Sequence, residues 1–99
     1  MNQMQQMLMQ AQRMQREMQK AHEELNAKEF PVSKNGMVDL VMMGDRSIKS
    51  LHIDKDALDP ENEEMLEEAL TMAINEALEQ IEKANEEIEQ KITGQKGMF

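Results

Sequence analysis

The chain of 99 residues contains no cysteine, tryptophan or tyrosine, and only two phenylalanines, two prolines and four glycines. The absence of cysteine excludes disulfides, thiolate catalysis and cysteine-ligated zinc, and it fits a reducing cytosol. The near absence of aromatic rings removes the stacking platforms that modules for RNA and single strands use. Twelve methionines supply much of the apolar material. We therefore expect one domain, residues 1–99, with a marginal core.

Long hydrophobic runs are also missing. No apolar stretch approaches the length of a transmembrane helix. The glutamine-rich start has no basic segment followed by an apolar run, so it does not resemble a signal peptide. We therefore expect a soluble, cytoplasmic protein without a membrane partner.

Residues that could carry catalysis or bind a metal are few. His22 lacks the second histidine that would complete a zinc-protease motif, and His52 stands in a sparse context. No glycine-rich phosphate loop follows a strand, and no serine lies near a base. An aspartate cluster lacks the glycine and glutamate of a calcium loop and is better explained as an acidic turn that caps a helix: Asp54, Asp56 and Asp59. We expect no enzymatic activity, metal, cofactor or small-molecule substrate.

The net charge of −9 is unevenly distributed. Residues 60–92 hold eleven glutamates against two lysines, whereas residues 1–28 carry a net charge of +1. One interpretation is that the first segment meets an anionic partner that the last segment repels. The other is that the glutamates only solubilise a long exposed helix.

The first segment has the pattern of a coiled-coil helix, predicted over residues 3–27. Its apolar residues recur at alternating gaps of three and four, which keeps one narrow seam facing a partner helix. The seam consists of Met4, Met7, Ala11, Met14, Met18, Ala21 and Leu25. Within it, Met7, Met14 and Met18 are predicted to pack against another helix or a second chain.

Three strands are predicted next, over residues 29–34, 37–43 and 47–53, as an antiparallel meander. Asn35-Gly36 is the strongest local signal for a type I′ hairpin between the first two. The second strand is apolar on both faces, because Val38 and Leu40 lie on one face and Val41 lies on the other. Such a strand is usually central and covered on both sides. In the third strand Ile48 is out of phase with Leu51, which indicates a two-sided strand or a bulge.

The last helix is predicted over residues 60–92, with Asp59 as its cap and a short tail over residues 93–99. The seam of the first helix, Met4 to Leu25, would span roughly 33 Å, and the last helix roughly 50 Å. A compact domain of this size has a radius of gyration of only about 13 Å. Both helices must therefore overhang the sheet, and their apolar stripes need cover there. This favours a homodimer that shares a sheet and holds out helical arms.

Arg13, Arg16 and Lys20 lie three and four residues apart, so they line one face of the first helix, offset from the seam. A binder of duplex DNA needs cations gathered in this way. Glu17 and Glu24 lie near enough in the helix to neutralise part of the strip.

Four motifs in order resemble the YbaB/EbfC family of bacterial nucleoid-associated proteins. They are a Met/Gln-rich opening helix, a glycine–valine hairpin, a turn into the last helix, and an alanine-rich last helix: residues 9–25, residues 35–38 with Gly44, residues 51–58, and residues 66–81. The resemblance implies an α-β-β-β-α chain, of the α+β class, that dimerises into a tweezer-like shape. It also implies binding of double-stranded DNA with little sequence specificity, affecting nucleoid organisation and gene expression.

In this family DNA binding is associated with the helical arms, which carries over here to Arg13, Arg16 and Lys20, and to Lys91 and Lys96 near the other end. The low glycine content of the hairpin and the acidic last helix depart from the family pattern. The second departure leaves the first helix and the tips as contacts. A different class also fits the pattern: two long amphipathic helices joined by hairpin strands resemble a prefoldin-type chaperone or adaptor for protein clients.

Overall fold

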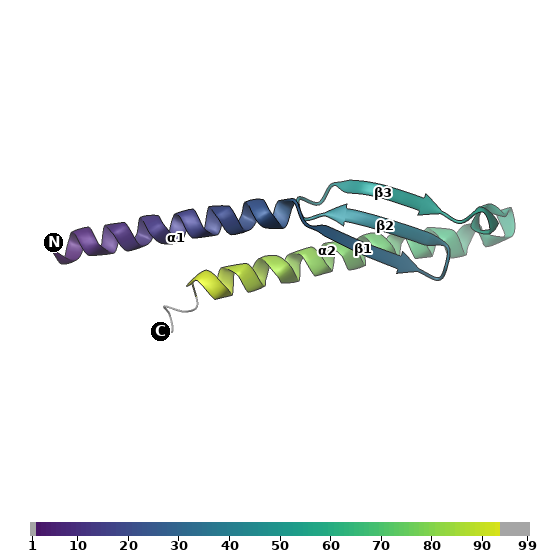
Figure 1. The fold of residues 1–99 in the computed structure, drawn as a ribbon. Coiled ribbons are helices and arrows are strands. Elements are labelled where there is room, and N and C mark those ends of the chain that lie inside the picture. The colour runs from purple at the N-terminus through teal and green to yellow at the C-terminus, as the bar shows by residue number, and fades with distance from the viewer. Residues whose placement is uncertain (1, 94–99) are drawn as a thin grey trace.

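The computed structural model describes residues 2–93 of the protein and has the α+β architecture that the sequence predicts (Figure 1). Its helices and strands are α1 (Gln3–Asn26), β1 (Glu29–Lys34), β2 (Val38–Met43), β3 (Ile48–Ile53) and α2 (Glu63–Thr93). Two short 3₁₀ turns that the sequence did not predict separate β3 from α2: η1 (Lys55–Leu58) and η2 (Pro60–Asn62).

The molecule is elongated. It measures 71 × 24 × 13 Å and has a radius of gyration of 19.8 Å, against about 13 Å for a compact chain of this length. Figure 1 shows α2 running along one face of the sheet and continuing beside the end of α1, while the N-terminal half of α1 extends past the end of α2. The predicted overhang of both helices is confirmed.

The sheet is antiparallel with β2 in the centre, as predicted. Asn35 and Gly36 have φ angles of 53° and 67°, both positive as a type I′ turn requires. The Met37 N–H donates to the Lys34 carbonyl oxygen at 2.9 Å, which closes the hairpin. Met37 therefore belongs to the turn, and β2 begins one residue later than predicted.

A bulge between Val41 and Met42 explains the phase of the third strand. Ser50 pairs with Val41 and Ile48 pairs with Met42, so Lys49 is the extra residue of β3. Directly paired residues point to the same face of an antiparallel sheet. The bulge therefore brings Ile48 onto the face that Leu51 shares with Leu40.

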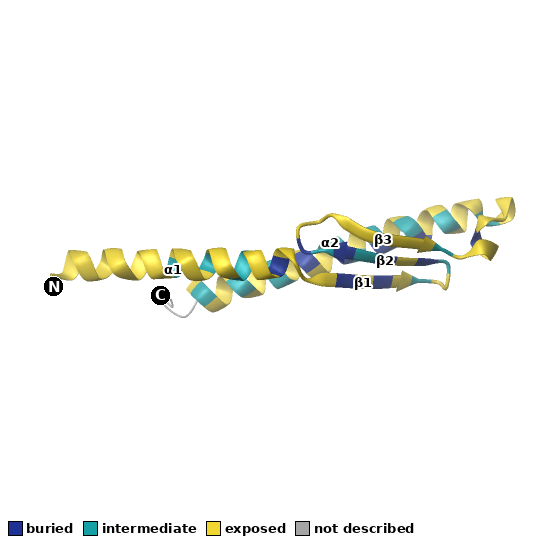
Figure 2. Ribbon diagram, turned by 45° about the horizontal axis from the view of Figure 1, so that its top comes forward, coloured by how far each residue is buried: buried dark blue, intermediate teal, exposed yellow. Residues whose placement is uncertain are grey.

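The core lies between α2 and the inner face of β1 and β2, as the dark blue segments of Figure 2 show. From α2 it receives mainly small residues, which let the helix approach the sheet closely. The buried residues of this layer are Phe30, Val32, Val38, Leu40, Met42, Ala69, Ala73, Ala77 and Ile81. Leu66 and Leu70 of α2 are larger and more hydrophobic than Ala69, yet both leucines are only half-buried, at the margin of the layer.

The opposite face of β2 differs from the prediction. Val41 and Met43 point away from the core and are half-buried, but no helix of residues 2–93 lies over them. The expectation that this strand is covered on both faces is wrong for the single chain. Val41 and Met43 are nonetheless only half-exposed, because the strands on either side of β2 shield them in part.

The aspartates after β3 cap the two short turns. The Asp54 carboxylate accepts from the Asp56 N–H at 3.3 Å, and the Asp59 carboxylate accepts from the Glu61 N–H at 3.0 Å. Asp54 and Asp59 thus act as caps, but of 3₁₀ turns: Asp59, which was expected to cap the last helix, caps η2 and not α2. The α-helix itself begins at Glu63, three residues later than predicted, because Pro60–Asn62 forms a 3₁₀ turn first.

Gly44 fixes the position of α1 against the sheet. Its N–H donates to the Lys28 carbonyl oxygen at 2.9 Å. A Cβ at this position would lie 1.7 Å from the carbonyl oxygen of Leu25, the last buried residue of α1. Two backbones therefore meet here at a distance that only glycine permits.

We predict that Gly44→Ala destabilises the protein by about 1–3 kcal/mol, because the backbone at the end of α1 must shift away from β2. Urea unfolding followed by circular dichroism measures the effect. Gly36→Asn is the matched control, since Gly36 has open space around it and asparagine tolerates positive φ. An unchanged midpoint for Gly44→Ala would contradict the assigned role.

Candidate functional site

The strip formed by Arg13, Arg16 and Lys20 lies on the side of α1 that faces away from α2. Ala21 and Leu25 mark the side toward α2, because both line the groove between the two helices. At 100° per residue, the strip is centred roughly 125° round the helix from them. All three basic side chains are exposed. The structure therefore presents them together on one open surface, as the spacing predicted.

The charges of the strip are unpaired. Among residues 2–93, ion pairs form only between Lys34 and Glu76, between Arg46 and Glu82 at 3.1 Å, and between Lys49 and Glu29 at 2.6 Å. These pairs neutralise cations of the sheet and its turns. Glu17 and Glu24, which the sequence placed near the strip, line the groove toward α2 instead. The three cations of the strip thus make no direct ion pair, although α1 also holds three glutamates, Glu17, Glu23 and Glu24.

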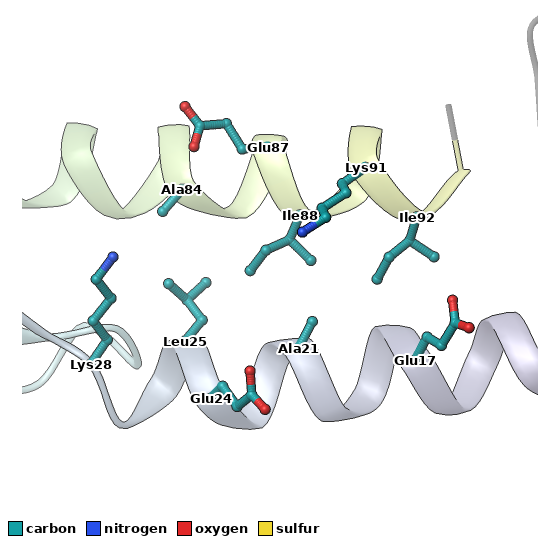
Figure 3. Close-up of a pocket in the computed structure, with 10 residues that line it drawn as sticks. All are labelled: Glu17, Ala21, Glu24, Leu25, Lys28, Ala84, Glu87, Ile88, Lys91 and Ile92. Carbon is teal, nitrogen blue, oxygen red and sulfur yellow. The ribbon is translucent and has the colours of Figure 1, made fainter. Parts of the chain in front are cut away.

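Lys91, the fourth predicted contact, lies elsewhere. It lines the groove between α1 and α2, whose floor is apolar and whose rim also carries Glu17, Glu87 and Lys28 (Figure 3). Acidic neighbours on both helices make this groove a poorer surface for phosphates than the strip. The structure does not join Lys91 to the strip, and Lys96 lies outside the described residues.

The predicted packing residues divide into three groups. Val38 and Leu40 are buried in the core against α2, and Val41 is half-buried on the other face of the sheet. Met14 and Met18 are half-buried on α1. Met7 is 65% exposed and belongs to the N-terminal half of α1, the half that extends past the end of α2 (Figure 1). Packing through Met7 stays a prediction.

An apolar surface on β3 was not predicted from the sequence. Leu51 and Ile53 pair with Leu40 and Val38, so they point to the helix-covered face of the sheet. However, α2 lies over β1 and β2 and makes little contact with β3. Ile48 and Leu51 remain 49% and 47% exposed, and β3 is almost entirely yellow in Figure 2. Pattern alone cannot show which strand a helix leaves uncovered.

The turn between β2 and β3 is held by its own side chains. Asp45 accepts hydrogen bonds from the hydroxyl and the N–H of Ser47. These two hydrogen bonds hold the pKa of the Asp45 carboxyl below its ordinary value, and the bond from the Ser47 hydroxyl has the larger effect. Arg46 takes a positive φ of 71° in this turn and reaches Glu82 on α2. This arrangement holds the turn against α2, and Glu82 neutralises part of the charge of Arg46.

Two further classes of site are missing from residues 2–93. This part of the chain holds no cluster of three histidine, aspartate or glutamate side chains suited to a metal ion. Nor does it hold a helix whose length and hydropathy would let it cross a membrane. The cations on α1 and the apolar face of β3 therefore remain as the candidate functional surfaces.

The fold and the strip define an α+β protein with an exposed helical arm that carries unpaired positive charge, a class suited to polyanions. The model of the YbaB/EbfC DNA-binding family matches residues 1–97, and the chain belongs to this family. A nucleoid-associated protein of Enterococcus faecalis is 46% identical over 99 residues, covering 99% of this chain and 93% of the relative. Another, of Mycoplasmopsis pulmonis, is 41% identical over 93 residues, covering 94% and 92%.

Proposed function

We propose that this protein binds double-stranded DNA through the phosphate backbone, with α1 as the contact element, as part of the bacterial nucleoid. The observation that carries the proposal is the gathering of three exposed cations on one face of α1 without an ion pair, whereas the other unpaired lysines of residues 2–93 are spread over other parts of the chain: Lys28, Lys55, Lys83 and Lys91. The cations on the exposed arm, Arg13, Arg16 and Lys20, are unpaired, whereas Lys34, Arg46 and Lys49 around the sheet are paired with glutamates. Family membership and the names of the relatives support DNA as the polyanion.

Binding of this kind carries little sequence information. Arginine and lysine on an exposed face reach phosphates from any sequence, whereas base reading needs side chains fitted into a groove. The acidic α2 repels DNA and so restricts binding to the arm. The protein then binds at many sites and affects nucleoid organisation and gene expression by occupying the duplex locally. It does not act through the recognition of one operator.

A second copy of the chain is proposed to cover the apolar face of β3. The half-buried residues Leu70 and Ile74 lie on the flank of α2 away from the Lys34–Glu76 pair. Because Lys34 belongs to β1, at the other edge of the sheet, this flank is the one toward β3, where Ile48 and Leu51 are exposed. Exposed apolar surface shared by a sheet and a helix is typical of an interface. A twofold dimer would bury it on both chains and bring two arms, with six cations, onto one assembly.

One experiment tests both parts of the proposal. Solution mass is measured by light scattering, and duplex binding is measured by fluorescence anisotropy across a salt series. We expect a dimer whose affinity falls with a log–log slope of about −5 if all six cations meet phosphates. A higher assembly indifferent to DNA would favour the chaperone class instead.

A further inference from the structure

The outer part of α1 carries an apolar stripe that nothing in residues 2–93 covers. Met4, Met7 and Leu8 are 78%, 65% and 58% exposed. Together with Ala11 they occupy one side of the helix. This stripe continues the seam that meets α2 further along, at Ala21 and Leu25. We call residues 3–12 the tip of α1.

The tip is electrically neutral in a strongly charged protein. Residues 2–12 contain no ionisable side chain, although the chain has a net charge of −9. Two copies of such a protein repel each other over most of their surface. At the tip this repulsion is smallest, and an acidic or basic partner would find no opposite charge there.

We propose that the tip is a self-association site, at which the α1 stripes of two copies pair. Spacings of three and four residues between Met4, Met7 and Ala11 of the tip, continued by Met14 just beyond it, suit side-by-side packing of two helices. Gln10 and Gln15 flank the stripe in an open trough along α1. Their amides both donate and accept hydrogen bonds, so they can pair with the same residues of a second copy.

This pairing leaves the basic strip accessible. The stripe and the strip lie on opposite sides of α1, roughly 160° apart. From Met4 to Met14 the pairing extends over only about 15 Å, so its affinity is low. This weak pairing therefore forms mainly where many copies of the protein are concentrated. There it would link copies that are bound to neighbouring or separate DNA duplexes.

The test is sedimentation of the full chain over a concentration series from about 10 µM to about 1 mM, at about 0.5 M salt, where interactions between charges are screened. We expect a further rise in mass above the species present at low concentration. Met7→Glu should raise the dissociation constant of this step at least about tenfold, since it places a carboxylate in the paired stripe.

Met9→Glu is the matched control. Met9 is 48% exposed on the tip but points to the other side of the helix, so the same added charge should change that constant less than about twofold. Neither residue contacts the folded core, and circular dichroism should show unchanged helix content. A constant mass over the series, or equal weakening by both variants, would overturn the proposal. Leu51→Glu distinguishes association through the tip from the proposed dimer, because this substitution lies on β3. The rise in mass caused by association through the tip should persist in this variant.

Discussion

Replacing Arg13, Arg16 and Lys20 together by alanine should weaken duplex binding on the order of a hundredfold at 0.1 M salt. Each phosphate that is no longer neutralised reduces the steepness of the log–log salt dependence by about 0.9. The affinity should therefore fall most at low salt, and the slope should become flatter. Because all three side chains are exposed and unpaired, and alanine favours helices, the fold should not change. Fluorescence anisotropy across a salt series measures both effects.

The matched control for this variant removes cations that are already neutralised. Arg46 pairs with Glu82 and Lys49 pairs with Glu29, so the double alanine variant at these positions should bind DNA almost as the parent does. Its net charge changes by two units in the same direction as that of the triple variant. Equal weakening in the two variants would show that total charge, not the strip, governs binding. An unchanged slope in the triple variant would exclude α1 as the contact element.

Leu51→Glu should convert the proposed dimer to a monomer. The side chain is 47% exposed in the single chain, so glutamate is tolerated there when the chain is alone. In a twofold interface the same change buries two carboxylates in apolar surroundings, which costs at least about 3 kcal/mol. Light scattering at concentrations where the parent is dimeric should show the mass halved.

Ser50→Glu is the control on the same strand. Ser50 pairs with Val41 on the opposite face of the sheet, away from α2, and should leave the mass unchanged. The monomeric variant would also present three arm cations in place of six, so its salt slope for DNA should be about half that of the parent. A Leu51→Glu protein that stays dimeric would place the interface on another surface.

Local signals in the sequence predicted the elements closely. The heptad spacing gave α1 to within one residue at either end, and Asn35-Gly36 gave the hairpin with both φ angles positive. Ile48 out of phase with Leu51 indicated a two-sided strand or a bulge, and the pairing of β2 with β3 contains the bulge. Such features depend on neighbours a few residues apart, so they can be read without the tertiary structure.

Packing between distant segments could not be predicted in this way. Gly44 reads as an ordinary turn residue, yet the backbone of Leu25 comes so close that no side chain fits there. Leu66 and Leu70 are more hydrophobic than Ala69, yet the alanine lies at the centre of the core. The closeness of α2 to the sheet decides this, because a helix that approaches closely leaves room only for small residues.

The basic strip shows both what the sequence determines by itself and what only the tertiary structure decides. Its spacing of three and four residues put Arg13, Arg16 and Lys20 on one helical face, and the sequence alone determined that. Only the tertiary structure decided that this face points away from α2, that Glu17 and Glu24 turn toward the groove, and that Lys91 stands apart from the strip. Helical periodicity fixes which residues share a side, whereas the packing of α1 on α2 fixes which side remains exposed.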